Sequence, residues 1–402
     1  MKPSSSTSDL PGDLRDGLFG GVYGSPAVNA ATSDRAWLTA LLDVERALAL
    51  AAARIGLVPA DAAAAVVEAC ETLDPDHLAT RLAAGAADQA TPVIALVSAL
   101  REAVPDGARK AVHPAATSQD VVDTAAMLIA HRALGPVLAD VVDLNGLLAA
   151  LAREHRETPQ VGRTLLQQGS PTTFGAVCAT RLVGIDEARE GLAEVRSRRL
   201  AVQLGGPVGT LAGAQGRGPA LVTGLADELG LAEPVTSWHT TRGRVAQLAA
   251  AAGVLAGELA GLAQDVVLLS AGEVAEVAEG TPGGSSAMPH KRNPAQAVLA
   301  VACAHRIPGL VATVLAGMPQ ELQRAAGRWQ AEWGTLTDLL RLLGGTAHHT
   351  VHALTGLQVD TAAMLRHLAQ LADVTGTAAF TEADIQAGAA VVDRALAAVE
   401  GR

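Results

Sequence analysis

The stretch from Thr281 to Pro294, TPGGSSAMPHKRNP, places adjacent serines, a Lys-Arg pair and an Asn-Pro pair within one short segment. Gly283 and Gly284 permit backbone conformations that other residues avoid, so we expect a loop that can move. Asn293 followed by Pro294 is typical of a helix start, with Asn as the cap and Pro in the first helical position. The segment is therefore predicted to be a mobile loop that leads directly into a helix.

The charges of this loop suggest an anion site. Lys291 and Arg292 lie just before the predicted helix start, where the free backbone N–H groups of a first turn also attract anions. Two cations beside a positive helix end would bind a carboxylate, and Ser285 and Ser286 on the mobile side could handle a substrate proton. On composition alone, a solvated Gly-Ser linker explains the segment equally well.

Three segments of the chain resemble the shared regions of the fumarase/aspartase superfamily. GSSAMPHKRNP is similar, residue for residue, to the signature loop of that superfamily, in the form carried by its adenylosuccinate lyase and carboxymuconate cycloisomerase branches. HPAATSQDVVDT, from His113 to Thr124, resembles the first shared region, and GRTLLQQGSPTTFG, from Gly162 to Gly175, resembles the second. The resemblance covers nearly the whole chain, from SDRAWL at Ser33 to VDRALA near the end.

The cycloisomerase branch is the most similar one. This similarity rests on SQD at Ser118, VQLGGPVGT from Val202 to Thr210 and SWHTTR from Ser237 to Arg242. It implies an enzyme that closes 3-carboxy-cis,cis-muconate to a carboxymuconolactone, a step of protocatechuate breakdown in the β-ketoadipate pathway. It also implies a homotetramer whose active sites each combine regions of three subunits, a small polycarboxylate substrate, and no cofactor or metal.

The resemblance also implies roles for individual residues. Ser285 would transfer the proton at the substrate carbon, and Lys291 would stabilise developing charge. The other expected substrate contacts are Thr117, Ser118, Thr164, Gln167, Arg242, Ser286, Met288 and Asn293. In the implied reaction a carboxylate oxygen adds to the carbon β to another carboxylate, which becomes a dianionic aci-form. Donors such as Lys291 and Asn293 would stabilise it as an oxyanion hole does, by about 3 kcal/mol each.

Several residues that the superfamily pattern predicts are absent. A histidine ordinarily stands in the second region, where this chain has Leu165 and Gln168, and the acidic residue that supports it would fall near Val298. Thr91 and Thr241 stand where Asn and Gln are expected. The C-terminal domain is also shortened. The chain therefore lacks a usual acid/base pair.

Three interpretations of these losses stay open. Lactone closure needs no strong acid at the missing histidine, because the attacking group is already an ionised carboxylate. Alternatively, the chain acts on another small polyanion, as a nitrosuccinate- or adenylosuccinate-type C–N or C–O lyase that removes a β leaving group from a substituted succinate. A third interpretation is a non-catalytic relative, like the lens crystallins of this superfamily. Intact Ser285, Lys291 and Asn293 argue against it, because a loop of this composition has no packing role.

Metal and thiol chemistry are not expected. His348, His349 and His352 include an i, i+4 pair that could bind a metal, but no third ligand with matching spacing follows. We therefore expect a solvated helix end and no metal site. The three cysteines lie in Ala- or Val-rich stretches and are expected to be buried reduced thiols: Cys70, Cys178 and Cys303.

The remaining histidines of the matched regions have less defined roles. For His113 and His239, contact with the substrate and a structural role are equally plausible. His290 neighbours the loop lysine and is expected to shape the loop rather than to transfer protons.

The elements that position these residues are predicted to be helices. Hydrophobic residues make up 49% of the chain and aromatic residues only 2%, which favours close-packed helices over sheets. A helix is expected from Ser33, where Ser33 or Asp34 can cap it. After Arg244, apolar residues alternate spacings of four and three: Leu248, Ala252, Leu255, Leu259, Leu262, Val266 and Leu269. This 3.5-residue repeat predicts a helix of roughly 40 Å in a left-handed bundle.

We predict an all-α chain of three helical domains around a long central bundle that forms a multi-subunit bundle. The predicted N-terminal helical domain comprises residues 1–110, the central bundle with the catalytic loop 281–294 comprises 111–355, and a short C-terminal helical domain comprises 356–402. The seam from Leu248 to Leu269 could pack within its own chain or against another subunit. We expect the second, in an assembly larger than a dimer.

Charge and hydropathy limit the partners and the compartment. The net charge is −11, so nucleic acid and anionic membranes are improbable partners. The N-terminus lacks the apolar run of a signal peptide, and no uncharged apolar run of 18 residues occurs. The protein is therefore expected to be cytoplasmic and not to span a membrane.

Overall fold

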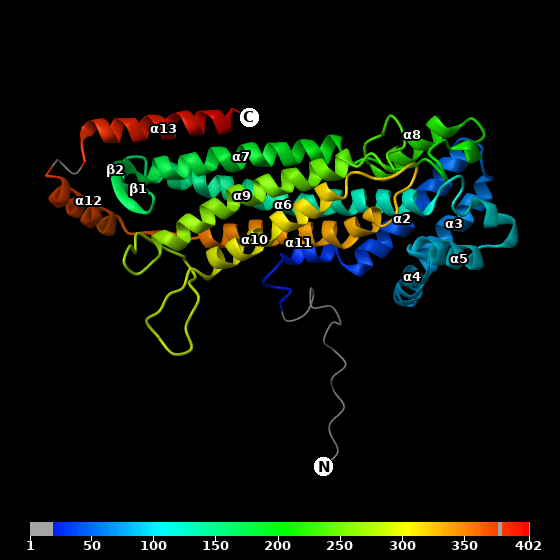
Figure 1. Ribbon diagram of the computed structural model, residues 1–402, viewed down its shortest axis with the longest axis horizontal. Helices are drawn as coiled ribbons and strands as arrows, with labels where there is room; N and C mark the ends of the chain where they lie inside the picture. Colours follow the sequence, from blue (N-terminus) through cyan, green and yellow to red (C-terminus); the bar gives the residue numbers. More distant parts are fainter. Residues whose placement is uncertain (1–18, 377–379, 402) are drawn as a thin grey trace, which may run out of the picture.

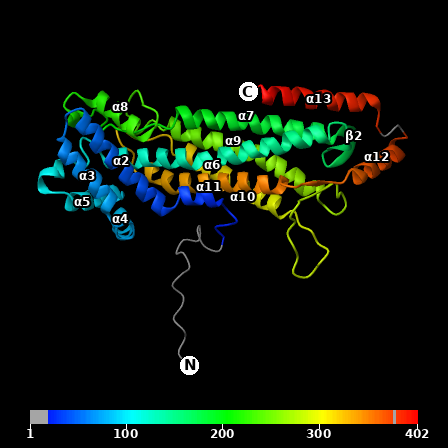
Figure 2. The same cartoon turned by 180° about the vertical axis from the view of Figure 1, so that it is seen from behind.

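The computed structural model describes residues 19–376 and 380–401, which form an elongated bundle of helices (Figure 1, Figure 2). The all-α class predicted from composition is confirmed. The strands are short and form two antiparallel pairs, β1–β2 and β3–β4. Neither pair was predicted, because β1 and β2 are polar and β3 and β4 have two residues each, so none shows the alternating apolar pattern of a half-buried strand.

In the N-terminal part, α2 to α5 are gathered at one end of the bundle, whereas α1 packs against α6 and α11 (Figure 1). Ser33 caps α2, as predicted, because its Oγ accepts a hydrogen bond from the Ala36 amide at 3.2 Å. The predicted domain boundary at residue 110 falls at the end of η1. The elements are α1 (Pro26–Ala31), α2 (Asp34–Arg54), α3 (Ala60–Thr72), α4 (Pro75–Gln89), α5 (Val93–Ala103) and the 3-10 helix η1 (Asp106–Ala111).

The long helices of the central bundle lie side by side along the molecule (Figure 1, Figure 2). They are α6 (Ser118–Glu154), α7 (Phe174–Arg198), α9 (Gly243–Leu269), α10 (Ala295–Ala316) and α11 (Arg328–Leu354). The 3-10 helix η2 (Ala212–Ala214) and α8 (Gly218–Leu229) connect α7 to α9, and α8 packs against α2. The connections bring polar segments to both ends of the bundle.

The apolar seam of α9 is covered by its own chain, so the expectation that another subunit covers it was wrong. Leu248, Leu255 and Leu259 are 0% exposed, and α9 packs against α7, α10 and α11. A 3.5-residue repeat shows that a helix has a packing partner, but it does not show from which chain the partner comes. The faces that remain exposed lie elsewhere on the bundle, at residues such as Val142, Val254 and Val298.

Three helices of the described chain, α6, α9 and α10, are long and apolar enough to cross a membrane by length and composition alone. The sequence criterion of an uncharged run was too strict to detect them, because each has at least one charged residue within its apolar stretch. In the structure they pack against one another or against α7 and α11. Even so, only 28% of the apolar window of α10 is buried within the chain.

Two antiparallel strand pairs and two helices complete the fold. β1 (Pro159–Thr164) and β2 (Gln167–Thr173) form a hairpin between α6 and α7, and β3 (Val277–Ala278) pairs with β4 (Gln358–Val359). The second pair ties the segment before the loop 281–294 to the C-terminal part, which begins just after α11. The C-terminal helices are α12 (Thr361–Thr375) and α13 (Glu382–Glu400), and α13 packs against α7.

Candidate active site

The loop 281–294 projects from the side of the bundle, between the end of α9 and the start of α10 (Figure 1). Gly283 and Asn293 close its neck through backbone hydrogen bonds of 2.8 and 2.9 Å. The side chain of Asn293 also donates to the Gly284 carbonyl at 3.0 Å. At the tip, the Ser285 hydroxyl accepts a hydrogen bond from the Met288 amide at 3.1 Å. The Ala287 amide donates to the same oxygen at 3.4 Å, so two backbone N–H groups contact the serine oxygen that is predicted to transfer the proton.

The predicted cap of α10 was wrong. The helix begins at Ala295, after Pro294, and Asn293 makes no cap bond because its amide holds the loop neck. The first-turn amides are capped by Glu279, whose carboxylate accepts from Gln296 at 3.2 Å and from Ala297 at 2.8 Å. This helix end is thus occupied by an anion of the chain itself and does not attract the substrate directly.

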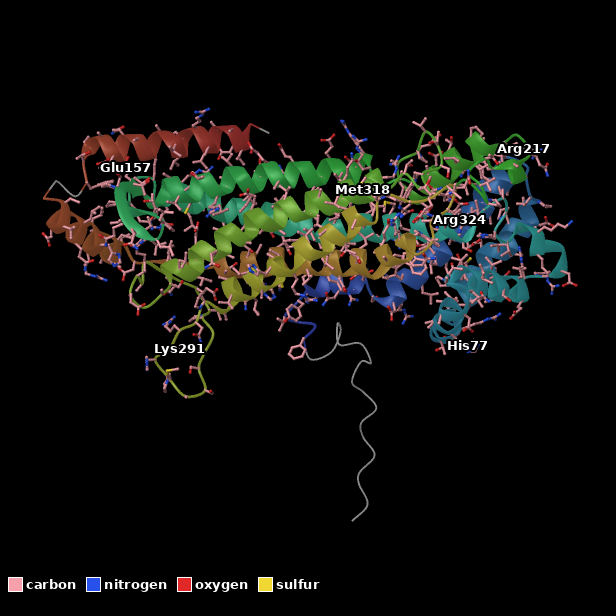
Figure 3. All side chains as sticks on the ribbon, in the orientation of Figure 1. His77, Glu157, Arg217, Lys291, Met318 and Arg324 are labelled. Atoms are coloured by element: carbon pink, nitrogen blue, oxygen red, sulfur yellow. The ribbon has the colours of Figure 1, made fainter. Side chains whose placement is uncertain are left out.

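The other loop groups are exposed and accessible. Ser286, Met288 and Lys291 are exposed on the loop surface, and Lys291 is well separated from the bundle (Figure 3). No ion pair engages Lys291 or Arg292 within residues 19–376 and 380–401. The loop cations are therefore available for a bound anion.

The first shared region forms the N-terminus of α6 and is organised by Asp120. This buried carboxylate accepts from the Thr117 amide at 2.9 Å, which confirms the predicted cap. It also accepts from the amides of Gly205 and Gly206, each at 2.9 Å, and lies 2.7 Å from the imidazole Nε2 of His239. Asp120 thereby joins three segments that are distant in sequence around Thr117. His239 is 3% exposed, which favours the structural role for it.

Arg324 reaches the same place, although no pattern in the sequence predicts it. Its guanidinium contacts the Thr117 hydroxyl and donates to the Gln119 amide oxygen at 3.0 Å. The residue is half-buried and comes from the segment between α10 and α11, close to the N-terminal end of the bundle (Figure 3). The polar stretch PQELQRAAGR holds two arginines, Arg324 and Arg328, and no distinctive spacing marks the first, so only the tertiary structure identifies this cation. It supplies the local positive charge that a polycarboxylate needs.

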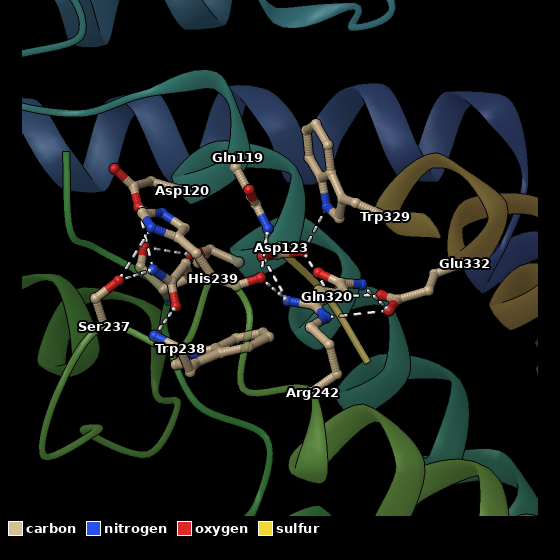
Figure 4. Close-up of polar contacts among 12 residues, drawn as sticks. Gln119, Asp120, Asp123, Ser237, Trp238, His239, Arg242, Gln320, Trp329 and Glu332 are labelled. Carbon is tan, nitrogen blue, oxygen red and sulfur yellow. Dashed lines mark hydrogen bonds and ion pairs between the residues drawn. The ribbon is translucent and has the colours of Figure 1, made fainter. Parts of the chain in front are cut away.

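Arg242 has a different environment from the one expected of a substrate contact (Figure 4). The side chain is 3% exposed, and its five N–H donors are all engaged within the chain. Asp123 receives two of them, at 2.9 and 3.0 Å, Glu332 receives two and the His239 carbonyl one. Burial alone would lower the pKa of Arg242, yet Asp123 and Glu332 raise it above its ordinary value. The geometry favours a positioning role for Arg242 beside the first region.

The second shared region is the β1–β2 hairpin. Thr164 pairs with Gln167, and the turn between them consists of Leu165 and Leu166 with φ of 50° and 62°. Both leucines lie in the left-handed region that favours glycine, and they are 96% and 72% exposed. One pair before the turn, Arg163 donates to the buried carboxylate of Glu276 at 2.6 and 3.0 Å, and nearer the base Gln160 donates to the same carboxylate at 2.8 Å. A firmly anchored hairpin thus presents an exposed tip.

Within one chain the three regions do not meet. Thr117 lies at the N-terminus of α6 and the hairpin follows its C-terminus. The length of this 37-residue helix, roughly 55 Å, therefore separates them. Arg242, which contacts the first region, precedes α9, whereas the loop 281–294 follows the far end of that 27-residue helix, roughly 40 Å away. The predicted substrate contacts Thr117 and Ser118 therefore lie far from Thr164 and Gln167 of the hairpin and far from the loop residues.

The groups considered for metal or thiol chemistry are mostly buried. No cluster of His, Cys, Asp and Glu in the described part of the chain is arranged to hold a metal. His349 was expected at a solvated helix end, but it is 4% exposed and its ring nitrogens contact the Gln296 side chain and the Val22 carbonyl. Burial raises the pKa of the thiols to about 12 in each case: Cys70, Cys178 and Cys303.

Comparison with known proteins shows to which family this chain belongs. A family model described as lyase matches residues 23–309. The chain is 42% identical over 367 residues to the 3-carboxy-cis,cis-muconate cycloisomerase of Pseudomonas aeruginosa, covering 90% of this chain and 79% of that protein. It is 41% identical over 382 residues to the nitrosuccinate lyase of Streptomyces davaonensis, covering 92% and 79%.

The fold agrees with these sequence matches. The crystal structure of the 3-carboxy-cis,cis-muconate lactonizing enzyme from Pseudomonas putida superposes with a TM-score of 0.81 at 36% identity, covering 96% of this chain and 88% of that one. The resemblance inferred from the three short regions thus extends over the whole bundle. The chain belongs to the lyase family of the fumarase/aspartase superfamily.

Proposed function

We propose that this chain is a cycloisomerase that converts 3-carboxy-cis,cis-muconate to a carboxymuconolactone, as the relatives of that name do. The observation that carries the proposal is that the chain has both an intact serine–lysine loop and, at the other end of α9, a candidate carboxylate site at Thr117, Ser118 and Arg324. The loop offers a hydroxyl surrounded by N–H groups, and the α6 end offers hydroxyls beside a cation. Together they suit a substrate with several carboxylates.

The proposed reaction uses these groups at different atoms. A carboxylate oxygen of the substrate forms the new C–O bond, and the double-bond electrons move into a second carboxylate. Thr117, Ser118 and Arg324 stabilise the charge there, by about 3 kcal/mol for a well-placed donor. Ser285 delivers the proton that forms the C–H bond, and Lys291 with the loop amides stabilises the serine oxygen. A tricarboxylate trianion and one proton thereby give a lactone with two carboxylates.

The missing histidine is compatible with this reaction. Leu165 and Gln168 occupy its expected positions at the exposed end of the hairpin. An ionised carboxylate attacks without losing a proton, so the step that closes the ring requires no base at that point. The absence of an acid argues more strongly against a lyase that releases an amine than against lactone closure, because an amine must be protonated to leave.

We propose that the active sites form between subunits of a homotetramer, because one chain keeps the three regions apart. The exposed apolar faces of α6, α9 and α10 support such an assembly. In the proposed tetramer, other subunits cover these faces, so they do not contact lipid. The protein then remains cytoplasmic, without nucleic acid or a cofactor. Light scattering in dilute buffer should give a mass larger than that of a dimer, and a monomer with full activity would contradict the shared sites.

A second candidate function is nitrosuccinate elimination. It is favoured by the 41% identity to the nitrosuccinate lyase and by the missing acid, because nitrite is a weak base that leaves without protonation. The loop serine would then remove a proton rather than deliver one. The carboxylate sites serve both reactions, so binding alone does not separate them.

A substrate panel separates the two functions. Purified protein is supplied with 3-carboxymuconate, nitrosuccinate, adenylosuccinate, argininosuccinate, or fumarate with ammonia. We expect loss of carboxymuconate absorbance at a turnover well above that for any other substrate. Unchanged carboxymuconate absorbance together with release of nitrite would replace the first function by the second.

A further inference from the structure

A cavity of about 560 Å³ opens beside Ser118, between α5, η1 and the start of α6. Its polar lining contains three cationic or ionisable groups, Arg101, Arg109 and His113. The one acidic side chain of the lining, Glu102, is bound to Arg81 at 2.6 and 2.7 Å. Arg109 is paired with Asp106 at 2.9 Å, so the positive charge of the cavity comes from Arg101 and the imidazole of His113. Its chemistry fits a carboxylate anion.

His113 is held at this cavity by a buried carboxylate. Its imidazole Nδ1 lies 2.6 Å from Oε1 of Glu45, which comes from α2 and is 0% exposed. The second oxygen of Glu45, Oε2, is buried and has no hydrogen-bond partner in the described part of the chain. A buried carboxylate with so few partners is stabilised chiefly by a positive charge on the imidazole. Nδ1 is engaged, so Nε2 is the nitrogen left for a ligand.

The backbone around His113 supports a functional arrangement. His113 has φ of 61° and Ala115 has φ of 60°, both in the left-handed region that residues other than glycine rarely adopt. Such conformations persist where the surrounding structure fixes them, and they are concentrated at ligand sites. These two residues lead directly to Thr117 and Ser118 at the start of α6. The strained turn therefore places the imidazole and the two hydroxyls at one end of the same segment.

We infer that this cavity binds one carboxylate of the substrate and that His113, as an imidazolium held by Glu45, donates a hydrogen bond to it. The inference rests on the proposed function and deepens it. As the C–O bond forms, the double-bond electrons enter this carboxylate, and the N–H of His113 stabilises the added charge while the proton stays on nitrogen. The proton on carbon still comes from Ser285. His113 thus supplies positive charge in a site that lacks the hairpin histidine.

The surroundings of His113 set the sign of its pH dependence. Burial lowers the pKa of His113, and so does the positive charge of Arg101. The negative charges of Glu45 and Asp120 raise it by more, so the pKa of His113 lies above its ordinary value. Arg109 and Glu102 are the other charged groups that line the cavity. A raised pKa means that the imidazolium is present below that pKa and is lost as pH rises through it. Anion binding should therefore weaken on the alkaline side.

The test measures binding of propane-1,2,3-tricarboxylate, a stable tricarboxylate, by calorimetry as a function of pH. His113→Gln should weaken binding about 10- to 100-fold at about pH 6, the scale of one charge-assisted hydrogen bond. Above the raised pKa of His113 the variant and the natural protein should bind alike, because both then lack the imidazolium. Glu45→Gln keeps the shape of the pair and should move the alkaline loss to lower pH. His77→Gln, at an exposed histidine of α4, is the matched control and should change neither affinity nor pH profile.

The outcomes distinguish this inference from the proposed function. Equal affinity and an unchanged pH profile in His113→Gln would overturn the inference. If that variant fails to fold by circular dichroism, Glu45→Gln decides, and an unshifted alkaline loss would overturn it too. A protein that binds the tricarboxylate through His113 yet leaves 3-carboxymuconate unchanged contradicts only the proposed function. Full turnover of 3-carboxymuconate with unaltered binding in His113→Gln contradicts only the inference.

Discussion

Replacing Ser285 with alanine is expected to lower turnover by a factor of about 10² or more, the usual scale for a general acid–base group. The serine hydroxyl is the proton-transfer group of the loop in this account, and its oxygen already accepts from the Met288 amide at 3.1 Å. Affinity should change little, because the carboxylates are held by Lys291 and by the groups at Thr117. Steady-state kinetics together with binding of a stable tricarboxylate measure the two effects separately.

Two neighbouring substitutions serve as comparisons for this result. Ser286→Ala should have a milder effect, because that hydroxyl acts on loop conformation or on one substrate oxygen. Lys291→Ala should weaken both binding and turnover, since its charge faces the anion before and during the reaction. Near-normal turnover in Ser285→Ala would show that a different group transfers the proton.

Removing the guanidinium of Arg242 is expected to lower the free energy of unfolding by about 3–5 kcal/mol, as for other broken buried ion pairs. Arg242→Ala would leave Asp123 and Glu332 buried side by side without their common cation. Burial already raises the pKa of Glu332, so this carboxylate is poorly able to remain charged without Arg242. Denaturant unfolding at fixed protein concentration measures the change, because assembly also contributes to stability.

Arg244→Ala is the matched control for this effect. Arg244 lies two positions further along, half-buried, and donates to the Arg199 carbonyl at 2.9 Å. Arg244→Ala should lower the free energy of unfolding far less than Arg242→Ala does, because no buried carboxylate is paired with Arg244. The double variant Arg242→Ala with Glu332→Gln should recover part of the stability. If Arg242→Ala and Arg244→Ala lowered the free energy of unfolding equally, the positioning role of Arg242 would be contradicted.

The helices could be predicted from sequence because their evidence is local. The cap at Ser33, the apolar spacing of α9 and the Ala- and Leu-rich composition each act within one helix, and the structure confirms them. The partner of a seam is not local, and the seam of α9 packs within its own chain instead of against another subunit. The hairpin β1–β2 was missed because its stability comes from Glu276 and from pairing rather than from an apolar pattern.

The candidate site was predictable only as separate segments. Motif similarity located the loop and the start of α6, and the capping pair of Thr117 and Asp120 followed from residue type and spacing. The assignment of Asn293 as a helix cap failed because Glu279, just after β3, takes that position. Arg324 was invisible because its contact with Thr117 joins residues far apart in sequence. Buried ion pairs such as that of Arg242 likewise appear only in three dimensions.

The shared active site is tested most directly by mixing two inactive chains. Thr117→Val damages the carboxylate site at the start of α6, and Ser285→Ala damages the loop. The two variants are co-expressed with different tags, and assemblies that contain both are purified and assayed for lactone formation. If each site takes Thr117 and Ser285 from different subunits, about a quarter of the sites in randomly mixed tetramers should contain both natural residues. Activity of about that fraction of the natural protein is the predicted result, and mixed assemblies no more active than either variant alone would contradict the account.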